Sequence, residues 1–150
     1  MLREMGWEVQ VEVSFAVGSE HGSVDLLAWH APMRLLLVVE IKTVLASTEQ
    51  MLRTLDRKVR LGPSIARRFG WRPTTTARLV VLPATRTNRR HVKALAHVVG
   101  PDLVTDAWAI RRWLRDPGAA MFATWVLASS RGSGTDRDIG GFQRVRPRKP

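Results

Sequence analysis

The chain has 150 residues, 45% of them hydrophobic, which is enough for one domain with a buried core. It contains no cysteine, which excludes disulfides and cysteine-ligated zinc and agrees with a cytoplasmic location, and no apolar run approaches the roughly 18 residues of a membrane span. The net charge of +11 favours a polyanionic partner, although an arginine-rich composition can also reflect a GC-rich genome.

Three strands are expected in the first third of the chain. Residues 7–15 alternate valines with polar side chains, as a half-buried strand does, and Glu12 falls on the polar side. A glycine-containing loop that includes Glu20 follows. Residues 23–30 and 35–41 then form two apolar strands joined by a short turn, and the second is apolar almost throughout, which is typical of a strand covered on both faces.

The spacing along these two apolar strands predicts how they pair. A hairpin with a four-residue loop pairs residues whose numbers sum to about 65, so Trp29 faces Leu36 and Asp25 faces Glu40. Opposed residues have Cβ atoms roughly 4.5–5.5 Å apart. Lys42 shares a face with Glu40 because side chains alternate along a strand. The pattern therefore predicts that Asp25, Glu40 and Lys42 converge on one face of the hairpin.

Two carboxylates so close to each other repel when both are ionised, and a divalent cation is the usual remedy. Their hard oxygen atoms suit Mg²⁺ or Mn²⁺ better than zinc. We expect Asp25 and Glu40 to ligate the ion, with the Ile41 backbone carbonyl and, less favoured, Glu20 as further ligands. Lys42 would orient a water nucleophile or neutralise a phosphate oxygen, which together describes phosphodiester hydrolysis. A structural Glu40–Lys42 ion pair is the competing interpretation.

Helical periodicity begins after these strands. Ser47 to Gln50 have the S-x-x-Q form of a capping box, and a buried stripe of Leu52, Leu55 and Val59 leads to Gly62-Pro63, which we expect to end the helix. A second short helix would span residues 63–69. One exposed face of the first helix, and the start of a later one, carry many cations, for which a merely solvated surface is the alternative interpretation. The residues expected to contact nucleic acid are Arg53, Arg57, Lys58, Arg60, Arg89 and Arg90.

The remaining chain predicts a fourth strand over residues 77–82, helices over 87–98 and 105–115, and a short apolar stretch over 121–127 that adds a final strand or docks loosely. From Ser129 onward Gly, Ser, Arg and Pro predominate, so the stretch lacks the apolar residues needed to fold. We expect a single domain over residues 1–128, followed by a basic disordered tail over residues 129–150.

Asp25 followed by Glu40-Ile41-Lys42 resembles the core of the PD-(D/E)xK nuclease superfamily, which includes restriction endonucleases and archaeal-type Holliday-junction resolvases. The resemblance implies an α/β fold with a restriction-endonuclease-like core of α-β-β-β-α-β order, in which helices flank a mixed central sheet made of a three-stranded meander and a further strand. It also implies an endonuclease that hydrolyses DNA with Mg²⁺ or Mn²⁺. In proteins similar to this one an acid near Glu12 joins the metal site. Residues 55–61 further resemble a segment of certain bacterial nuclease-like proteins.

The chain departs from this family pattern in two places. Val24 rather than proline precedes Asp25, and only residues 2–5 precede the first strand, where such nucleases carry a helix with an accessory Glu. We expect that helix to be truncated, with Glu4 as its remnant. A catalytically inactive DNA-binding or regulatory module on the same scaffold is therefore the main alternative. An RNA-directed nuclease would share the same pattern, and many enzymes of this kind act as homodimers.

Overall fold

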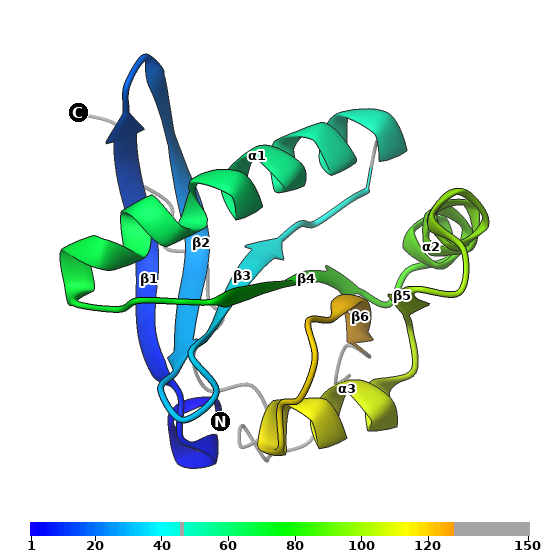
Figure 1. The fold of residues 1–150 in the computed structure, drawn as a ribbon. Helices are drawn as coiled ribbons and strands as arrows, with labels where there is room; N and C mark the ends of the chain where they lie inside the picture. The colour runs from blue at the N-terminus through cyan, green and yellow to red at the C-terminus, as the bar shows by residue number, and fades with distance from the viewer. Residues whose placement is uncertain (46, 128–150) are drawn as a thin grey trace, which may run out of the picture.

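The computed structural model describes residues 1–45 and 47–127, which form a mixed β-sheet covered by helices (Figure 1). The antiparallel meander expected from the sequence consists of β1 (Glu8–Val17), β2 (Glu20–His30) and β3 (Leu35–Ile41). The third strand has the bounds that its apolar run predicted. The tail expected over residues 129–150 lies outside the described residues.

The second half of the sheet is parallel. β4 (Thr75–Pro83) pairs with β3, β6 (Phe122–Leu127) pairs with β4, and the short β5 (Leu103–Val104) pairs with the outer side of β6. The six strands therefore lie in the order β1-β2-β3-β4-β6-β5. The α/β class and the mixed sheet were predicted, and the apolar stretch near residue 121 does add a strand. The two-residue β5 was not anticipated.

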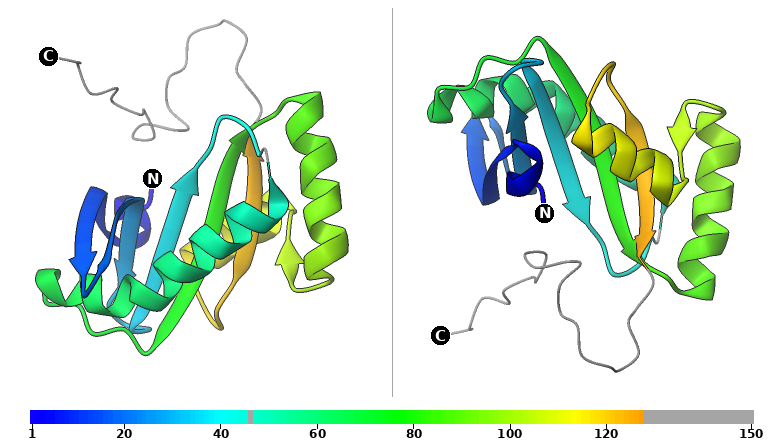
Figure 2. Two further views of the ribbon diagram at one scale, coloured as in Figure 1. Left: turned by 90° about the horizontal axis from the view of Figure 1, so that it is seen from above. Right: turned by 90° about the horizontal axis from the view of Figure 1, so that it is seen from below.

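Three α-helices cover the two faces of the sheet in the described part of the chain (Figure 2). α1 (Thr48–Ala66) lies across one face and α3 (Ala107–Arg115) lies on the other, while α2 (Arg86–Val99) packs beside the parallel half. Each helix begins at a side-chain cap, provided by Ser47, Thr85 and Asp106. None of these helices is long and apolar enough to cross a membrane.

The sheet separates two apolar cores. The core between the sheet and α1 also includes Val92 and Leu95 of α2, whereas the core beneath α3 is built around Ile110 and Leu114. Because β3 contributes to both cores, its residues Leu35 to Val39 are completely buried. The continuous apolar run of this strand is explained by burial on two faces.

The predicted helix break at Gly62-Pro63 is wrong, because α1 continues through both residues to Ala66. Gly62 faces β3, and a Cβ atom there would lie 3.0 Å from Leu36 Cδ2. The glycine therefore permits close packing of helix on sheet instead of ending the helix. Pro63 lacks an N–H group for the helix ladder, and the burial of Ile65 and Ala66 beyond it offsets that loss.

The N-terminal helix expected from the resemblance is represented by a single 3-10 turn, Arg3–Met5. Glu4 lies in this turn and is 3.4 Å from the amino group of Met1. Leu2 and Trp7, on either side of the turn, are buried in the core beneath α3. The turn therefore closes one end of this core.

Candidate active site at the open end of the β2–β3 hairpin

The predicted register of the β2–β3 hairpin is confirmed from Leu26 to His30, but the predicted pair of Asp25 with Glu40 is not among the paired residues. Trp29 pairs with Leu36, and the ladder continues as far as Leu26 opposite Val39. Beyond this last pair the two strands stop exchanging backbone hydrogen bonds. Asp25 instead accepts a hydrogen bond from the backbone N–H of Ile41 through Oδ2, at 2.7 Å. The hairpin therefore brings Asp25 to the end of β3, as the spacing predicted.

A local irregularity in β1 and β2 positions the Asp25 carboxylate. The β1–β2 ladder is interrupted where Glu12 would face Asp25, and Glu12 has a left-handed backbone, with φ of 49°. Val24 packs in the core under α1 and Leu26 in the core under α3, although residues two apart in a regular strand share a face. The face of β2 thus reverses at Asp25, which leaves its carboxylate beside the end of β3.

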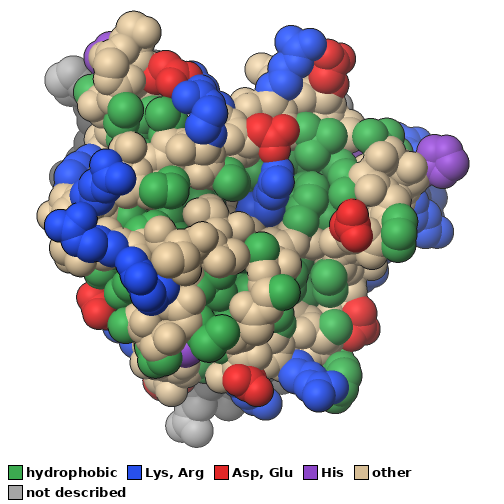
Figure 3. Space-filling view, viewed as in Figure 1, with side chains coloured by type: hydrophobic (Ala, Val, Ile, Leu, Met, Phe, Trp, Pro, Cys, Tyr) green, Lys and Arg blue, Asp and Glu red, His purple; other side chains and the backbone are tan. Residues whose placement is uncertain are grey.

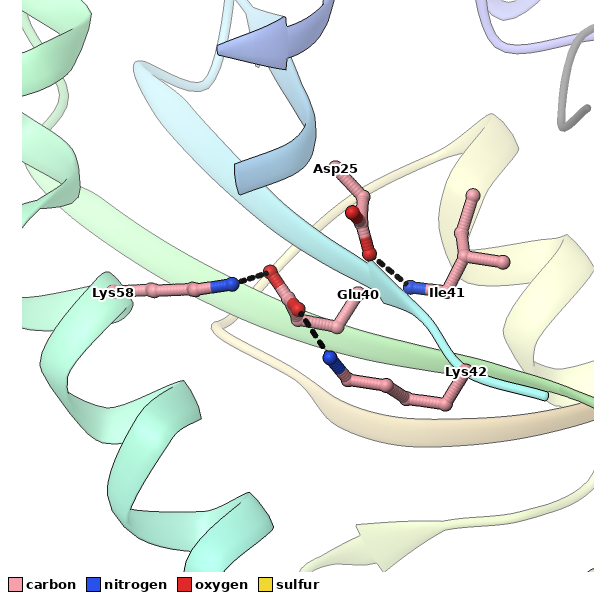
Figure 4. A network of polar contacts seen from close by, with 5 residues as sticks. All are labelled: Asp25, Glu40, Ile41, Lys42 and Lys58. Carbon is pink, nitrogen blue, oxygen red and sulfur yellow. Dashed lines mark hydrogen bonds and ion pairs between the residues drawn. The ribbon is translucent and has the colours of Figure 1, made fainter. Parts of the chain in front are cut away.

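Glu40 is the most deeply buried charged residue of the site, at 2% exposure. Its Oε1 accepts a hydrogen bond from Lys58 Nζ at 2.7 Å, and its Oε2 lies 3.3 Å from Lys42 Nζ (Figure 4). The Lys42 contact is close enough for an ion pair, but its geometry is not that of a hydrogen bond, so Oε2 has no hydrogen-bond partner. The predicted proximity of Glu40 and Lys42 is therefore present as an ion pair, in which Oε2 of Glu40 has no hydrogen-bond partner.

Lys58 was expected on an exposed basic face, and that expectation is wrong. Its exposure is 7%, and it reaches from α1 to Glu40 on the sheet (Figure 4). The helix face that packs on the sheet runs through Met51, Leu55, Lys58, Leu61, Gly62, Ile65 and Ala66. Position 58 follows Leu55 by three residues, so helical spacing already indicated the inner face. The predicted buried stripe included Leu52 and Val59, which are only partly buried, and this placed Lys58 on the outer face.

A pocket of about 170 Å³ opens onto Glu40 and Lys42. The loop after β3 forms one wall, with Val44, Leu45 and Ser47. The first turns of α1 form the other wall, with Gln50, Met51, Thr54 and Leu55. Thr54 and Gln50 lie about one and two helical turns before Lys58, so the three side chains share one face of α1. Sequence reasoning missed Gln50 and Thr54, whose spacings of eight and four residues from Lys58 were the available signal.

Asn88 of α2 holds the loop that forms the first wall. Its side chain is fully buried, accepts a hydrogen bond from Leu45 N at 3.1 Å, and donates to the carbonyls of Thr43 and Pro83, both at 3.0 Å. His91, one turn further along α2, also contacts the carbonyl of Leu45. The chain that follows Lys42 is therefore fixed to α2 by side chains that satisfy its backbone groups.

The two less favoured metal ligands are not drawn into the site. Glu20 pairs with Arg60 at 2.8 Å, and the hydrogen bond from this guanidinium lowers the pKa of the Glu20 carboxyl. Glu12 is exposed on β1. Among residues 1–45 and 47–127, no three or more His, Cys, Asp or Glu side chains are grouped to hold a metal ion. Of the predicted carboxylate ligands, Asp25 and Glu40 therefore remain at the end of β3.

The predicted basic residues other than Lys58 lie nearer the surface. Lys and Arg side chains gather over the C-terminal half of α1 and over α2 (Figure 3). Arg53 and Arg60 are exposed and pair with Glu49 and Glu20, and Arg57 is half-buried. At the start of α2, a shallow hollow of about 440 Å³ is lined by Arg86, Arg89, Arg90 and Lys93. These cations lie on two helices, α1 and α2.

The donor set fits a hard divalent cation. Mg²⁺ commonly uses one or two protein carboxylates and keeps several water ligands. Glu40 Oε2 is buried without a hydrogen-bond partner and belongs to a residue that lines the pocket. Comparison of the chain with protein-family models finds no match, and neither does a search of curated proteins. The functional argument therefore depends on this geometry.

Proposed function

We propose that this chain is a metal-dependent endonuclease that hydrolyses DNA phosphodiester bonds. The observation that carries the proposal is the pairing of Glu40 with Lys42 in the pocket at the open end of the hairpin, where one oxygen of Glu40 is left without a hydrogen bond. The Asp25 carboxylate lies on the backbone N–H of Ile41, the residue between them. Two carboxylates and a lysine are the side chains that metal-assisted phosphodiester hydrolysis requires.

The arrangement of elements supports a restriction-endonuclease-like core. A three-stranded meander is followed by α1 and then by a strand that pairs in parallel with β3. This matches the β-β-β-α-β part of the order that the resemblance implies. The site lies at the end of β3, between the sheet and α1, where that core would carry its catalytic group.

Each residue has a distinct part in the proposed reaction. Asp25 and Glu40 would hold Mg²⁺ or Mn²⁺, with the Ile41 carbonyl at the end of β3 as a further donor. The bound ion would activate a water ligand and stabilise the charge that develops on the phosphate. Lys42 is half-exposed in the pocket, where its ammonium group can orient the attacking water or contact a phosphate oxygen.

The charge distribution supports a nucleic acid as the partner. The net charge of the chain is +11, and exposed cations gather on α1 and α2. Arg53, Arg57, Arg60, Arg89 and Arg90 would contact the phosphate backbone, and Lys58 is withdrawn from this group because it is buried. A cytoplasmic location and a homodimer belong to the same proposal.

The second candidate is a DNA-binding module without catalytic activity. It is favoured by the ion pairs of Glu40, whose two oxygens already lie 2.7 Å and 3.3 Å from the ammonium groups of Lys58 and Lys42. The two lysines balance the negative charge of the Glu40 carboxylate without a metal ion. The basic surface would serve both functions, so metal dependence separates them.

The test is cleavage of plasmid, single-stranded and branched DNA, and of an RNA of matched sequence, with Mg²⁺, Mn²⁺ or EDTA. We expect metal-dependent cleavage that is lost in the double variant Glu40→Ala, Lys42→Ala. Asp102→Ala removes an exposed carboxylate in the turn before β5 and should cleave as the unsubstituted protein does. Binding of DNA without cleavage, unchanged by the double substitution, would reject the enzyme and favour the second candidate.

A further inference from the structure

We propose that Lys58 is the resident cation of the Glu40 site and that it opposes the binding of a divalent cation there. This inference rests on the proposed metal site. Lys58 Nζ lies 2.7 Å from Glu40 Oε1, and both residues are buried, at 7% and 2% exposure. A buried carboxylate requires a positive partner, and α1 provides one in the absence of any metal.

The local charges sum to zero before any ion binds. Asp25 and Glu40 contribute two negative charges, and Lys42 and Lys58 contribute two positive charges. A divalent cation on Glu40 would share this carboxylate with the Lys58 ammonium group. Water screens little at a buried position, so the repulsion between the two cations is strong. Lys58 therefore weakens divalent binding while it stabilises the metal-free protein.

The two lysines differ in their freedom to make room. Lys42 has a side-chain exposure of 38%, lines the pocket, and approaches Glu40 Oε2 without a hydrogen bond. It can move toward solvent when an ion takes that oxygen. Lys58 projects from the buried face of α1 between Leu55 and Leu61, and it hydrogen-bonds the opposite oxygen, Oε1. Its charge therefore stays beside the site in both states.

The test is the affinity of the full chain for Mn²⁺ alone, measured by titration calorimetry in the absence of DNA. Lys58→Met removes the charge and keeps an unbranched apolar chain, so the dissociation constant for Mn²⁺ should fall by about tenfold or more. Arg115→Met, a matched loss of one positive charge from the exposed face of α3, should leave it unchanged. The melting temperature of Lys58→Met should also rise more on addition of Mn²⁺ than that of the unsubstituted protein.

A second variant keeps the inference testable if Lys58→Met does not fold. Lys58→Gln is neutral, retains an N–H donor, and should also bind Mn²⁺ more tightly than the unsubstituted protein. Equal or weaker binding by the neutral variants would overturn the inference and leave the proposed enzyme standing. Binding by the variants alone would support the inference and reject the enzyme, because Lys58 would then exclude the ion. No binding by any of the three would reject both.

Discussion

The helices α1 and α3 cover opposite faces of one sheet and differ in what they bury. Both are amphipathic, and both carry arginines on their outer faces. The buried residues of α3 are the apolar Ile110 and Leu114, whereas α1 buries Lys58 within an otherwise apolar face. The burial of the Lys58 ammonium group is explained by its ion pair with Glu40 on the sheet. Among the described residues, the buried ion pair therefore lies on the face of the sheet that α1 covers.

Removal of one member of this buried pair should give the largest effect. In EDTA, we expect Lys58→Ala to lower the free energy of unfolding by about 3–5 kcal/mol, since it leaves the Glu40 carboxylate buried without its closest partner. Arg115→Ala, at an exposed position of α3, should change it by less than about 0.5 kcal/mol. Urea denaturation of both variants measures the difference.

A double variant separates loss of the charge from loss of packing. Lys58→Met removes the charge and keeps a similar volume, and Glu40→Gln added to it also removes the unpaired carboxylate, so the double variant should recover most of the stability lost in Lys58→Met. If the double variant is as unstable as Lys58→Met, an unpaired charge on Glu40 does not explain the loss.

The hairpin register could be predicted because two independent signals agreed. The loop length places Trp29 opposite Leu36, the alternation along the strands agrees with this register, and Asp25 is thereby brought to the end of β3, where it accepts from Ile41 N. The bounds of β3 followed from its apolar run for a similar reason, since burial on two faces leaves few polar residues in such a strand. Local patterns were sufficient where the geometry is set by near neighbours in the sequence.

Three features of the site could not be predicted in this way, because they depend on packing between distant elements. Gly62 lies inside α1, where the absence of a side chain allows the helix to pack closely on Leu36. Helix propensity is a local property and does not include this contact. Lys58 turns inward because Glu40 lies across the core. The reversal of β2 at Asp25 requires a matching irregularity at Glu12 in β1. The spacing of three residues between Leu55 and Lys58 was the one local indication that Lys58 lies on the buried face of α1.

The hydrogen bonds of Asn88 extend the comparison to α2. We expect Asn88→Ala to lower the free energy of unfolding by about 1–3 kcal/mol, because it leaves Leu45 N and the carbonyls of Thr43 and Pro83 without their partner. Trp113→Phe removes one exposed hydrogen bond from α3 to Ala119 and should cost less. Amide exchange at Leu45 should accelerate in the Asn88 variant; unchanged exchange would show that Asn88 does not hold this loop.

The pair between Glu20 and Arg60 is the exposed counterpart of the buried Lys58 pair and should have the smallest effect. The hydrogen bond from Arg60 lowers the pKa of Glu20, so the folded state favours the ionised carboxylate. The pair therefore stabilises the fold above the ordinary glutamate pKa of about 4.3, and this contribution is lost as the pH falls through the lowered value. An NMR titration should place the Glu20 midpoint below the ordinary value, and in Arg60→Gln the midpoint should rise toward it. Because the pair is exposed, added salt should reduce the shift, whereas salt should barely change the cost of Lys58→Ala. A Glu20 midpoint that is unaffected by Arg60→Gln would contradict this account of the pair.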